Sequence, residues 1–411
     1  MFYLKEGIEM RIGLFTDQYY PNISGVVTSV KMLYEGLTAM GHECFIFSSF
    51  DEKLVETTPE LTNKNVINLP GVRYPFKSVK DYRYTFFHTK GLKMIKDCNL
   101  DIIHVHTEFG ISKYAIKAHR KYKIPMVHTL HTLWTDYFKY LSPYFDKHNH
   151  KQMSWILKNM FCGPVSKNST IEIVPTKKVC EQANEYSLGN NIRIVPTGIE
   201  LDRFKASNFK KEDFYDLKKK YVIVDDQFVF LYIGRTSKEK SITNLIEAYC
   251  EACFNNKKTK LLIVGGGPEL PELKQLVKDL NIEDQVVFTD LIPWEEIPIY
   301  YQLGNVFINA SQSETQGLTY LEALASSIPV LVQKDECVED LIHNYYNGVF
   351  FEGQEDLVLK IKELLKAPET LKTIKANTLP SIDDYSKDKF SSNIYHIYQE
   401  AKELYNPKNN K

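Results

Sequence analysis

The sequence lacks several features that would place it in a class at once. It has no run of 18 apolar residues, and residues 1–6 lack the basic-then-apolar order of a signal peptide. Its seven cysteines are scattered and odd in number, which does not fit a disulfide framework in a chain of 411 residues. Glycine and proline, at 19 and 17, are too few for a collagen-like or disordered chain. We therefore predict a globular protein of a reducing, cytosolic compartment.

Length and charge suggest two parts. At ~150 residues per domain the chain has room for two or three domains, and we favour two. Residues 1–200 hold 25 Lys and Arg against 19 Asp and Glu, whereas residues 201–411 hold 26 against 33. A basic half suits an anionic partner such as membrane lipid or nucleic acid, and ordinary scatter between two solvated surfaces would look the same.

Short apolar runs alternate with helix-length segments in both halves. The predicted strands are 11–15, 44–47, 66–69, 101–105, 126–130, 171–174 and 192–195, then 228–233, 261–264, 286–289, 306–309 and 329–332. Strands that alternate with helices predict parallel sheets covered on both faces, so the fold class is α/β with two doubly wound domains. Pro196 and Gly198 mark the boundary, which gives domains of 1–199 and 200–385. The final segment, 386–411, carries an apolar stripe from Phe390 to Tyr405 that must dock on another element.

Two loops at predicted strand ends are candidates for a phosphate site, and one of them carries suitable charge. Arg235 and Lys240 follow strand 228–233 beside a helix start, where cations are unfavourable unless an anion satisfies them. A bound diphosphate would satisfy them, and an exposed basic loop is the alternative. The Gly265–Gly267 run lacks the residues of a P-loop and is interpreted mainly as a tight turn.

The strongest local signal is the segment 314–322. It opens a helix at Gly317, so the N–H groups of Gly317, Leu318 and Thr319 can face a phosphate. Glu314 and Glu322, two carboxylates in this segment, can hold sugar and ribose hydroxyls. The alternative is that Glu322 only favours the helix dipole. Gly25, at the start of the first long helix, is a weaker candidate for backbone contact with a ligand.

Histidines at two strand ends invite a metal interpretation, which we disfavour. His104 and His106 share one strand face, and His128 and His131 end the next strand. No carboxylate or cysteine stands at ligand spacing beside them, and the chain has no Asp-x-Asp triplet. We therefore predict no metal site and expect one histidine to line a sugar pocket.

A basic, aromatic stretch covers residues 72–97. Its cations are typical of a surface helix on anionic lipid, each worth ~1 kcal/mol near the surface, although an ordinary amphipathic helix would look similar. These candidate membrane contacts are Arg73, Lys77, Lys80, Arg83, Lys90, Lys93 and Lys96.

In chain order, these motifs resemble those of GT4-type retaining glycosyltransferases of the GT-B fold. The resemblance covers residues 11 to about 400 and rests on five motifs. They are Gly-Val-Val at 25–27, His-x-His-Thr-Glu at 104–108, Pro-Thr-Gly-Ile-Glu at 196–200, Gly-Arg-x-x-Lys-Glu-Lys at 234–240, and the Glu314–Glu322 spacing. Residues 15–30 and 131–137 look more narrowly like bacterial diacylglycerol glucosyltransferases. Two departures, Ser327 and the segment 335–338 in place of expected glycines, put part of the donor pocket in doubt.

The resemblance implies a metal-independent, retaining hexosyltransferase with a UDP-sugar donor and no tightly bound cofactor. Arg235 and Lys240 would hold the diphosphate, helped by Gly25 and the amides of residues 317–319. Glu322 would take the ribose hydroxyls, while Glu314 and His131 would flank the transferred sugar. The implied acceptor-side residues are Trp134, Asp136 and Tyr137. Members of this family send their last helix back to the N-terminal domain.

The expected function is transfer of glucose from UDP-glucose to the 3-hydroxyl of 1,2-diacylglycerol, for glycolipid synthesis. The expected partners are UDP-glucose and diacylglycerol in an anionic membrane, with no nucleic acid, and the expected place is the inner face of the cell membrane. Three alternatives stay open. They are a GT4 enzyme acting on a soluble or polyprenyl-linked saccharide, a sugar-nucleotide epimerase, and an inactive UDP-sugar-binding protein.

Overall fold

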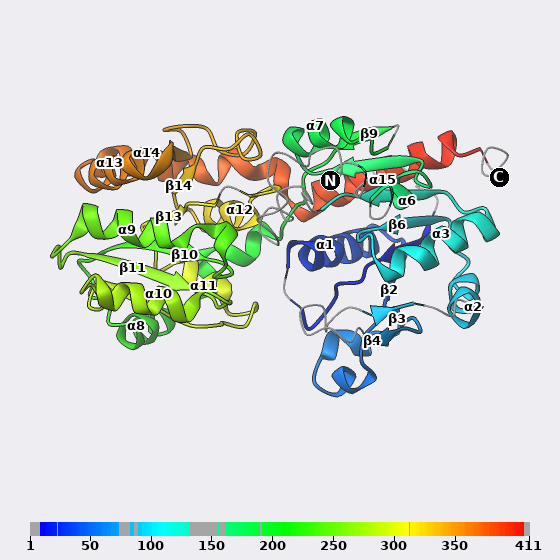
Figure 1. Ribbon diagram of the computed structural model, residues 1–411, viewed down its shortest axis with the longest axis horizontal. Coiled ribbons are helices and arrows are strands. Elements are labelled where there is room, and N and C mark those ends of the chain that lie inside the picture. Colours follow the sequence, from blue (N-terminus) through cyan, green and yellow to red (C-terminus); the bar gives the residue numbers. More distant parts are fainter. Residues whose placement is uncertain are drawn as a thin grey trace. The chain divides into compact units, whose positions relative to one another are not determined.

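The chain folds into two compact units. The computed structural model describes residues 9–22, 24–73, 83–85, 89–131, 155, 159, 162–189, 191–311 and 313–406 (Figure 1). Unit 1 comprises Met1–Gly198 and Lys387–Lys411, and unit 2 comprises Ile199–Ser386. Each of the two boundaries between the units lies one residue away from the domain limit that we expected. Within unit 2, Ile199 and Ser386 form an isolated β-bridge, so the two ends of this unit lie side by side.

Unit 1 is built on a seven-stranded parallel sheet with the order β3-β2-β1-β6-β7-β8-β9. The strands are β1 (Arg11–Phe15), β2 (Glu43–Ser48), β3 (Val66–Asn68), β6 (Ile102–Val105), β7 (Met126–Thr129), β8 (Ile171–Val174) and β9 (Ile192–Ile194). The helices are α1 (Gly25–Ala39), α2 (Thr89–Asp97), α3 (Gly110–Tyr122), α6 (Cys162–Ser166), α7 (Lys177–Glu185) and α15 (Lys387–Leu404). A small antiparallel pair, β4 (Val72–Arg73) and β5 (Arg83–Tyr84), lies outside this sheet.

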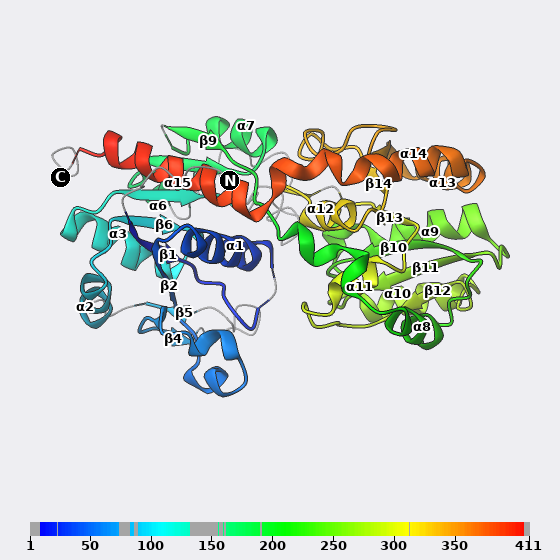
Figure 2. The same cartoon turned by 180° about the vertical axis from the view of Figure 1, so that it is seen from behind.

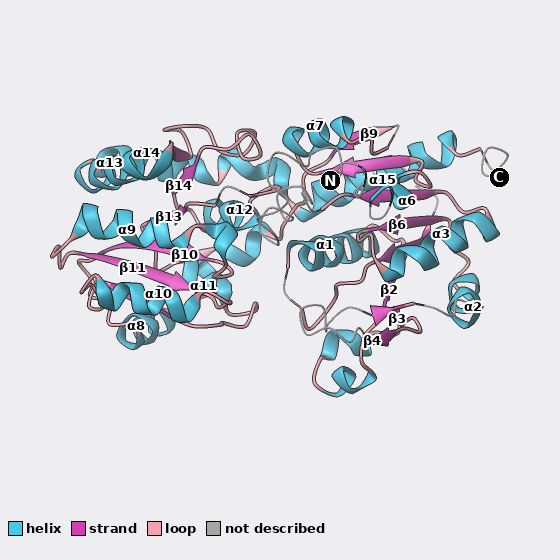
Figure 3. Ribbon diagram, in the orientation of Figure 1, coloured by secondary structure: helices cyan, strands magenta, loops and turns pink. Residues whose placement is uncertain are grey.

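Unit 2 repeats the design with a six-stranded parallel sheet in the order β12-β11-β10-β13-β14-β15 (Figure 3). The strands are β10 (Phe228–Ile233), β11 (Thr259–Val264), β12 (Val286–Phe288), β13 (Val306–Asn309), β14 (Val330–Gln333) and β15 (Gly348–Phe351). The helices are α8 (Lys211–Lys220), α9 (Ile242–Cys253), α10 (Leu270–Asp279), α11 (Ile297–Tyr301), α12 (Leu318–Ala325), α13 (Gly353–Lys366) and α14 (Pro368–Thr378). The predicted pair of parallel-sheet α/β domains is confirmed.

The alternation of side chains along each strand explains the core layers on the two faces of a sheet. Successive side chains of a strand point to opposite faces of its sheet, so a buried strand must be apolar on both. In β10, Val229, Leu231 and Ile233 join one core layer, and Phe230 and Tyr232 join the other. Both layers consist of unit 2 residues alone. The near-continuous apolar runs in the sequence therefore reflect sheets that are covered on both sides.

Helix α15 docks its apolar stripe on unit 1. Phe390, Ile394, Tyr398 and other stripe residues join the core layer that contains α1, and the view from behind shows α15 running alongside α1 (Figure 2). Leu404, which we had included in the stripe, is 49% exposed and takes no part. Close approach of the two helices explains Gly36, because a Cβ there would lie 2.0 Å from the Ser391 hydroxyl oxygen.

Each sheet has one point where the strand order reverses. In unit 1 it lies between β1 and β6, and in unit 2 between β10 and β13. Ligands of open α/β sheets bind outside the carboxyl ends of the strands at such a point, because the connecting helices lie on opposite faces there. The loops that follow β1, β6, β10 and β13 are therefore the places to look for a site.

Candidate functional site

The charged residues expected at a diphosphate meet at the switch point of unit 2. Lys240 ends the short helix η8 (Lys238–Lys240) after β10, and Glu314 lies in the loop after β13. The Lys240 ammonium donates a hydrogen bond to a Glu314 carboxylate oxygen at 2.6 Å, and the two side chains are 23% and 13% exposed. The structure thus joins two predicted site residues that lie on different loops.

This ion pair fixes the charge of Lys240. Burial alone would lower the pKa of Lys240, but the charge and the hydrogen bond of Glu314 outweigh burial and raise the pKa above its ordinary value. The lysine is therefore cationic at neutral pH. One step of the sequence argument needs correction, because the anion that satisfies Lys240 here is a carboxylate of the chain itself.

Arg235 lies in the same loop and is exposed. The loop after β11 presses closely against this loop, and glycine is required there. A Cβ at Gly265 would lie 2.1 Å from the Gly234 carbonyl oxygen, and one at Gly267 would lie 2.3 Å from the Thr236 carbonyl oxygen. The Gly265–Gly267 run thus supports the Arg235 loop, which gives a physical reason for interpreting it as a tight turn.

The amino end of α12 faces the same strand ends. Gly317 caps the helix in a left-handed conformation, with φ at +76°, and the helix proper begins at Leu318 rather than at Gly317. A helix does not use the N–H groups of its first turn internally, so Leu318 and Thr319 can offer theirs to an anion. Gly317 therefore supplies the cap of α12, and the residues that follow it supply the first free amides.

Glu322 has the polar partner that its apolar surroundings require. It is buried in α12, and the hydroxyl of Tyr301, at the end of α11, donates a hydrogen bond to its carboxylate at 2.7 Å. Burial raises the pKa of Glu322 to about 7, although the Tyr301 hydrogen bond and the charge of Arg203 act in the opposite direction. Sequence reasoning missed Tyr301. The only indication in the sequence is that it forms a pair with Tyr300 in a short apolar stretch.

Gly25 is exposed and is the first residue of α1. Ser24 caps this helix by accepting a hydrogen bond from the Val27 N–H, and its own hydroxyl donates to Gln18 at 2.8 Å. The absence of a side chain at Gly25 leaves the helix terminus open to approach.

The four histidines gather at the carboxyl ends of β6 and β7 in unit 1. His131 Nε2 lies 3.0 Å from His106 Nδ1, and His104 bonds Tyr398 and Thr129 through its two ring nitrogens, both at 2.7 Å. Burial and the nearby charge of His128 lower the pKa of His131 to about 3. His131, the histidine expected at the sugar, is therefore neutral.

Carboxylates stand beside His128, although we found none at ligand spacing beside these histidines in the sequence. Its Nδ1 is 2.6 Å from Glu172 on β8, and its Nε2 is 3.5 Å from Glu108 after β6. Burial would lower the pKa of His128, but these two carboxylates raise it to about 10. In the described part of the chain, no three His, Cys, Asp or Glu side chains are arranged to hold a metal ion.

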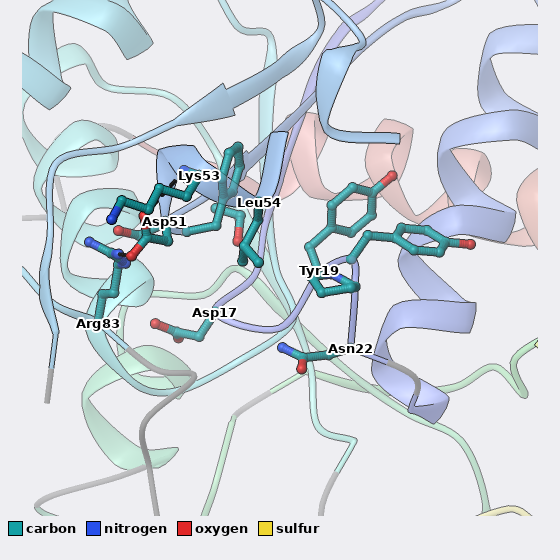
Figure 4. A pocket seen from close by; sticks show the side chains of 12 residues that line it. Asp17, Tyr19, Asn22, Asp51, Lys53, Leu54 and Arg83 are labelled. Carbon is teal, nitrogen blue, oxygen red and sulfur yellow. Dashed lines mark hydrogen bonds and ion pairs between the residues drawn. The ribbon is translucent and has the colours of Figure 1, made fainter. Parts of the chain in front are cut away.

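A pocket of about 270 Å³ opens beside the carboxyl ends of β1 and β2 in unit 1 (Figure 4). It combines aromatic, carboxylate, cationic and amide side chains, which is a lining suited to a molecule with several hydroxyl groups. Ser49 is among the lining residues, and its buried hydroxyl has no hydrogen-bond partner in the described structure. The labelled residues are Asp17, Tyr19, Asn22, Asp51, Lys53, Leu54 and Arg83.

Asp17 anchors this pocket at the switch point of unit 1. Its carboxylate accepts hydrogen bonds from the Thr107 hydroxyl at 2.6 Å and from the Ile111 N–H at 3.0 Å. Burial raises the pKa of Asp17 to about 6, and the two hydrogen bonds limit the rise. The sequence search did not select Asp17, although it lies two residues after the end of the first strand.

The basic stretch divides into parts with different surroundings. Arg83 is paired with Asp51 at 3.1 Å and donates to the Gly71 carbonyl oxygen, so it belongs to the pocket wall. Lys90, Lys93 and Lys96 are exposed along α2, whose opposite face, Leu92 and Ile95, is buried in the core of unit 1. Helix α2 therefore offers charge outward and has no free apolar face.

Several expected site residues lie outside the described residues. They are Lys77, Lys80, Trp134, Asp136 and Tyr137, and of Arg73 only the backbone is described. No helix in the described ranges has both the length and the apolar composition needed to cross a bilayer.

Comparisons with known proteins identify the family. Residues 23–203 match the family model described as Glycosyltransferase Family 4, and residues 213–379 match the one described as Glycosyl transferases group 1. The chain is 35% identical to the alpha-monoglucosyldiacylglycerol synthase of Acholeplasma laidlawii, covering 98% of this chain and 100% of the relative. It is 34% identical to the Streptococcus pneumoniae protein of the same name, covering 95% of this chain and 86% of the relative.

A solved structure shares the fold. Anabaena Alr3699/HepE in complex with UDP and glucose superposes with a TM-score of 0.73 at 16% identity, covering 95% of this chain and 100% of that chain. The near full-length relatives, the two matched models and the two parallel-sheet units agree with the resemblance seen in the motifs. The chain belongs to the GT4 family of glycosyltransferases and has their GT-B fold.

Proposed function

We propose that the protein is a hexosyltransferase that moves glucose from UDP-glucose to the 3-hydroxyl of 1,2-diacylglycerol with retention of anomeric configuration. The single observation that carries this proposal is the near full-length similarity, at 34–35% identity, to two proteins named alpha-monoglucosyldiacylglycerol synthase. The HepE structure, titled as a complex with UDP and glucose, supports the same class of donor.

We assign the donor to the loops at the switch point of unit 2. Arg235 and Lys240 would hold the diphosphate together with the amides of Gly317, Leu318 and Thr319. Glu322 would accept hydrogen bonds from the ribose hydroxyls. A diphosphate that enters this place competes with Glu314 for Lys240, which would release the Glu314 carboxylate toward the transferred sugar. From unit 1, we assign Gly25 to the diphosphate and His131 to the sugar.

The proposed reaction exchanges one bond at the anomeric carbon for another. The bond to the diphosphate oxygen breaks, the bond to the acceptor oxygen forms on the same face, and the acceptor proton passes to the departing UDP. Charge develops on the leaving group, so fixed cations and helix amides are the main contribution of the protein. Because these groups supply the charge stabilisation, the proposal needs no metal ion and no tightly bound cofactor.

We assign the acceptor to unit 1. The pocket beside Asp17 has hydroxyl-binding side chains, among them Asn22 and the unpartnered hydroxyl of Ser49, which suits the glycerol end of a diacylglycerol. The exposed lysines of α2 would attract an anionic membrane surface. Since the apolar face of α2 is buried, the contact that we propose is electrostatic and peripheral, on the inner face of the cell membrane.

Transfer of labelled sugar to diacylglycerol tests the proposal. We expect a glucolipid from UDP-glucose in vesicles, more of it with anionic lipid, and less product with UDP-galactose. If UDP-glucose is hydrolysed or bound but no glycolipid forms, the acceptor is wrong and the saccharide alternative takes its place. Neither binding nor turnover of a UDP-sugar would contradict the donor as well.

A matched pair of variants tests the diphosphate assignment. Lys240→Ala, or Arg235→Ala with it, should abolish transfer, whereas Lys238→Ala removes an exposed cation of the same loop and should leave turnover close to that of the parent protein. Unchanged far-UV circular dichroism would establish that each variant folds. Normal turnover of the Arg235→Ala/Lys240→Ala variant would overturn the assignment.

A further inference from the structure

His106 lies directly behind His131 and has no role in the reaction described above. It is 1% exposed, and contacts hold both its backbone and its ring. Its backbone N–H donates to the Phe15 carbonyl oxygen at 2.8 Å, its ring centroid lies 4.0 Å from that of His104, and its Nδ1 lies 3.0 Å from His131 Nε2. His104 is in turn fixed through both of its ring nitrogens. His131 therefore contacts a histidine that is itself held in place.

Both rings of the contact are neutral. Burial lowers the pKa of His106 well below its ordinary value, and the neighbouring histidines lower it further. The same causes act on His131. A neutral imidazole carries its one ring proton on either Nδ1 or Nε2. In the hydrogen bond between these two rings, one ring therefore donates and the other accepts.

The far nitrogen of His106 decides which ring donates. His106 Nε2 is buried and has no hydrogen-bond partner in the described structure. If His131 donated, the proton of His106 would have to sit on this Nε2 as a buried N–H without an acceptor, and such orphaned N–H groups are rarer in proteins than orphaned acceptors. If His106 donates from Nδ1, its Nε2 is only an unused lone pair.

We infer that His106 is a positioning residue that donates from Nδ1 to His131 Nε2 and so fixes His131 in the tautomer that carries its proton on Nδ1. His131 then presents an N–H donor, in a fixed ring orientation, on the side away from His106. The consequence for turnover rests on the proposed function, in which His131 contacts the transferred sugar. An N–H donor at that place can bind a sugar oxygen. If the His131 ring exchanged between its two tautomers, it would present this donor only part of the time.

Nitrogen-15 NMR of the histidine rings tests the tautomer without any substrate. In protein with ring-labelled histidine, the His131 signals, assigned by their loss in His131→Gln, should show a protonated Nδ1 and a bare Nε2. In His106→Leu, which has no donor, His131 should shift toward the other tautomer. In His106→Asn, whose amide nitrogen can take the place of Nδ1, the original pattern should remain. A protonated Nε2 in the parent protein would overturn the inference, whether or not the protein transfers sugar to lipid.

Kinetics then separate positioning from general damage. His106→Leu should lower kcat about tenfold or more, and His106→Asn should restore most of it. In a His131→Ala background, His106→Leu should cause little further loss, because its effect passes through His131. His119 serves as the matched control, since it is also a buried histidine of unit 1 but bonds the Ile124 carbonyl oxygen. Any effect of His119→Asn should be the same with and without His131. Equal loss from His106→Leu in both backgrounds would contradict a positioning role.

Discussion

Glu322 holds a carboxylate where burial penalises its charge. Its hydrogen-bond partner is a neutral hydroxyl, that of Tyr301, and this hydrogen bond and the charge of Arg203 only partly offset the cost of burying the charge. An amino acid that costs stability when ionised is usually retained for another reason, such as binding. This is consistent with our assignment of Glu322 to the ribose hydroxyls, which would supply further donors.

The pH dependence of stability reveals this cost. The pKa of Glu322 is about 7 in the folded chain against 4.5 as the ordinary value, so the group favours folding below the ordinary pKa and loses that contribution as pH rises through the folded pKa. Glu322→Gln cannot ionise. The variant should therefore unfold like the parent near pH ~4.5 and be more stable by up to about 3 kcal/mol near pH ~8.

Urea unfolding at both pH values measures this difference. The m value should stay the same while the midpoint moves, which marks a change in stability rather than in the unfolded chain. Thr319→Val, a change on the same helix without a titrating group, serves as the control. A stability difference between Glu322→Gln and the parent that does not vary with pH would show that the carboxylate is not strained by burial.

At the level of elements, helix α15 depends on a close approach to α1. A methyl group at Gly36 would meet the Ser391 side chain at 2.0 and 2.7 Å, so one of the two helices would have to move. Alanine is a better helix former than glycine, yet we expect Gly36→Ala to destabilise the protein by about 1–3 kcal/mol because overpacking outweighs propensity.

A compensating change distinguishes overpacking from other causes. Ser391→Gly removes the atoms that the new methyl group would meet. In the Ser391→Gly background, Gly36→Ala should therefore cost much less stability than it does in the parent protein. The measurement is the urea midpoint of the four proteins. Simple additivity of the two single effects would contradict the close contact.

The exposed face of α2 makes a second prediction at this scale. Replacing Lys90, Lys93 and Lys96 by Gln should weaken binding to anionic vesicles about a hundredfold, since each cation contributes ~1 kcal/mol near a charged surface. The control replaces three exposed lysines of α3 at helical spacing, Lys113, Lys117 and Lys121, by Gln. Cosedimentation with vesicles measures both, and equal losses would mean that only the net charge of unit 1 matters.

The elements also show how far the sequence reaches. Long apolar runs such as 228–233 predict their strands correctly, because a strand buried on both faces needs such a run. Strand β15 (Gly348–Phe351) was missed because it begins at a glycine that follows Asn347, and an Asn-Gly pair is typical of a turn. The β4–β5 pair was missed because each strand has only two residues, which are too few to show a strand period.

The sequence selects candidate site residues, but it does not show the contacts between them. Lys240 and Glu314 are 74 positions apart and meet because β13 lies next to β10, although β11 and β12 come between them in the chain. His128 and Glu172 are 44 positions apart and meet because β7 pairs with β8. Periodicity shows where strands lie in the chain, whereas the order of strands in a sheet depends on packing between distant segments.

At the scale of the whole molecule, each unit has a core of its own. Both core layers of unit 2 consist of residues between Ile199 and Ile382, and the layers of unit 1 draw only on the chain before Gly198 and on α15. We therefore expect the fragment 199–386, produced alone, to fold and to unfold cooperatively in urea.

Two-dimensional NMR and urea unfolding of this fragment check the prediction. Dispersed amide signals and a single transition are the expected results. The fragment should also bind UDP if the donor loops belong to unit 2 as proposed, and Lys240→Ala in the fragment should remove that binding. A broad transition with collapsed amide signals would mean that unit 2 depends on the rest of the chain.

The bridge between Ile199 and Ser386 has a consequence for how such a protein can change. The Ile199 N–H donates to the Tyr385 carbonyl oxygen at 2.9 Å, so the entrance and the exit of unit 2 are adjacent and tied together. A segment whose two ends meet can be exchanged as a cassette through two cuts, without stretching the host chain at either junction. Recombination between related genes at these two positions would pair a new unit 2 with an unchanged unit 1, in which α15 still packs on α1.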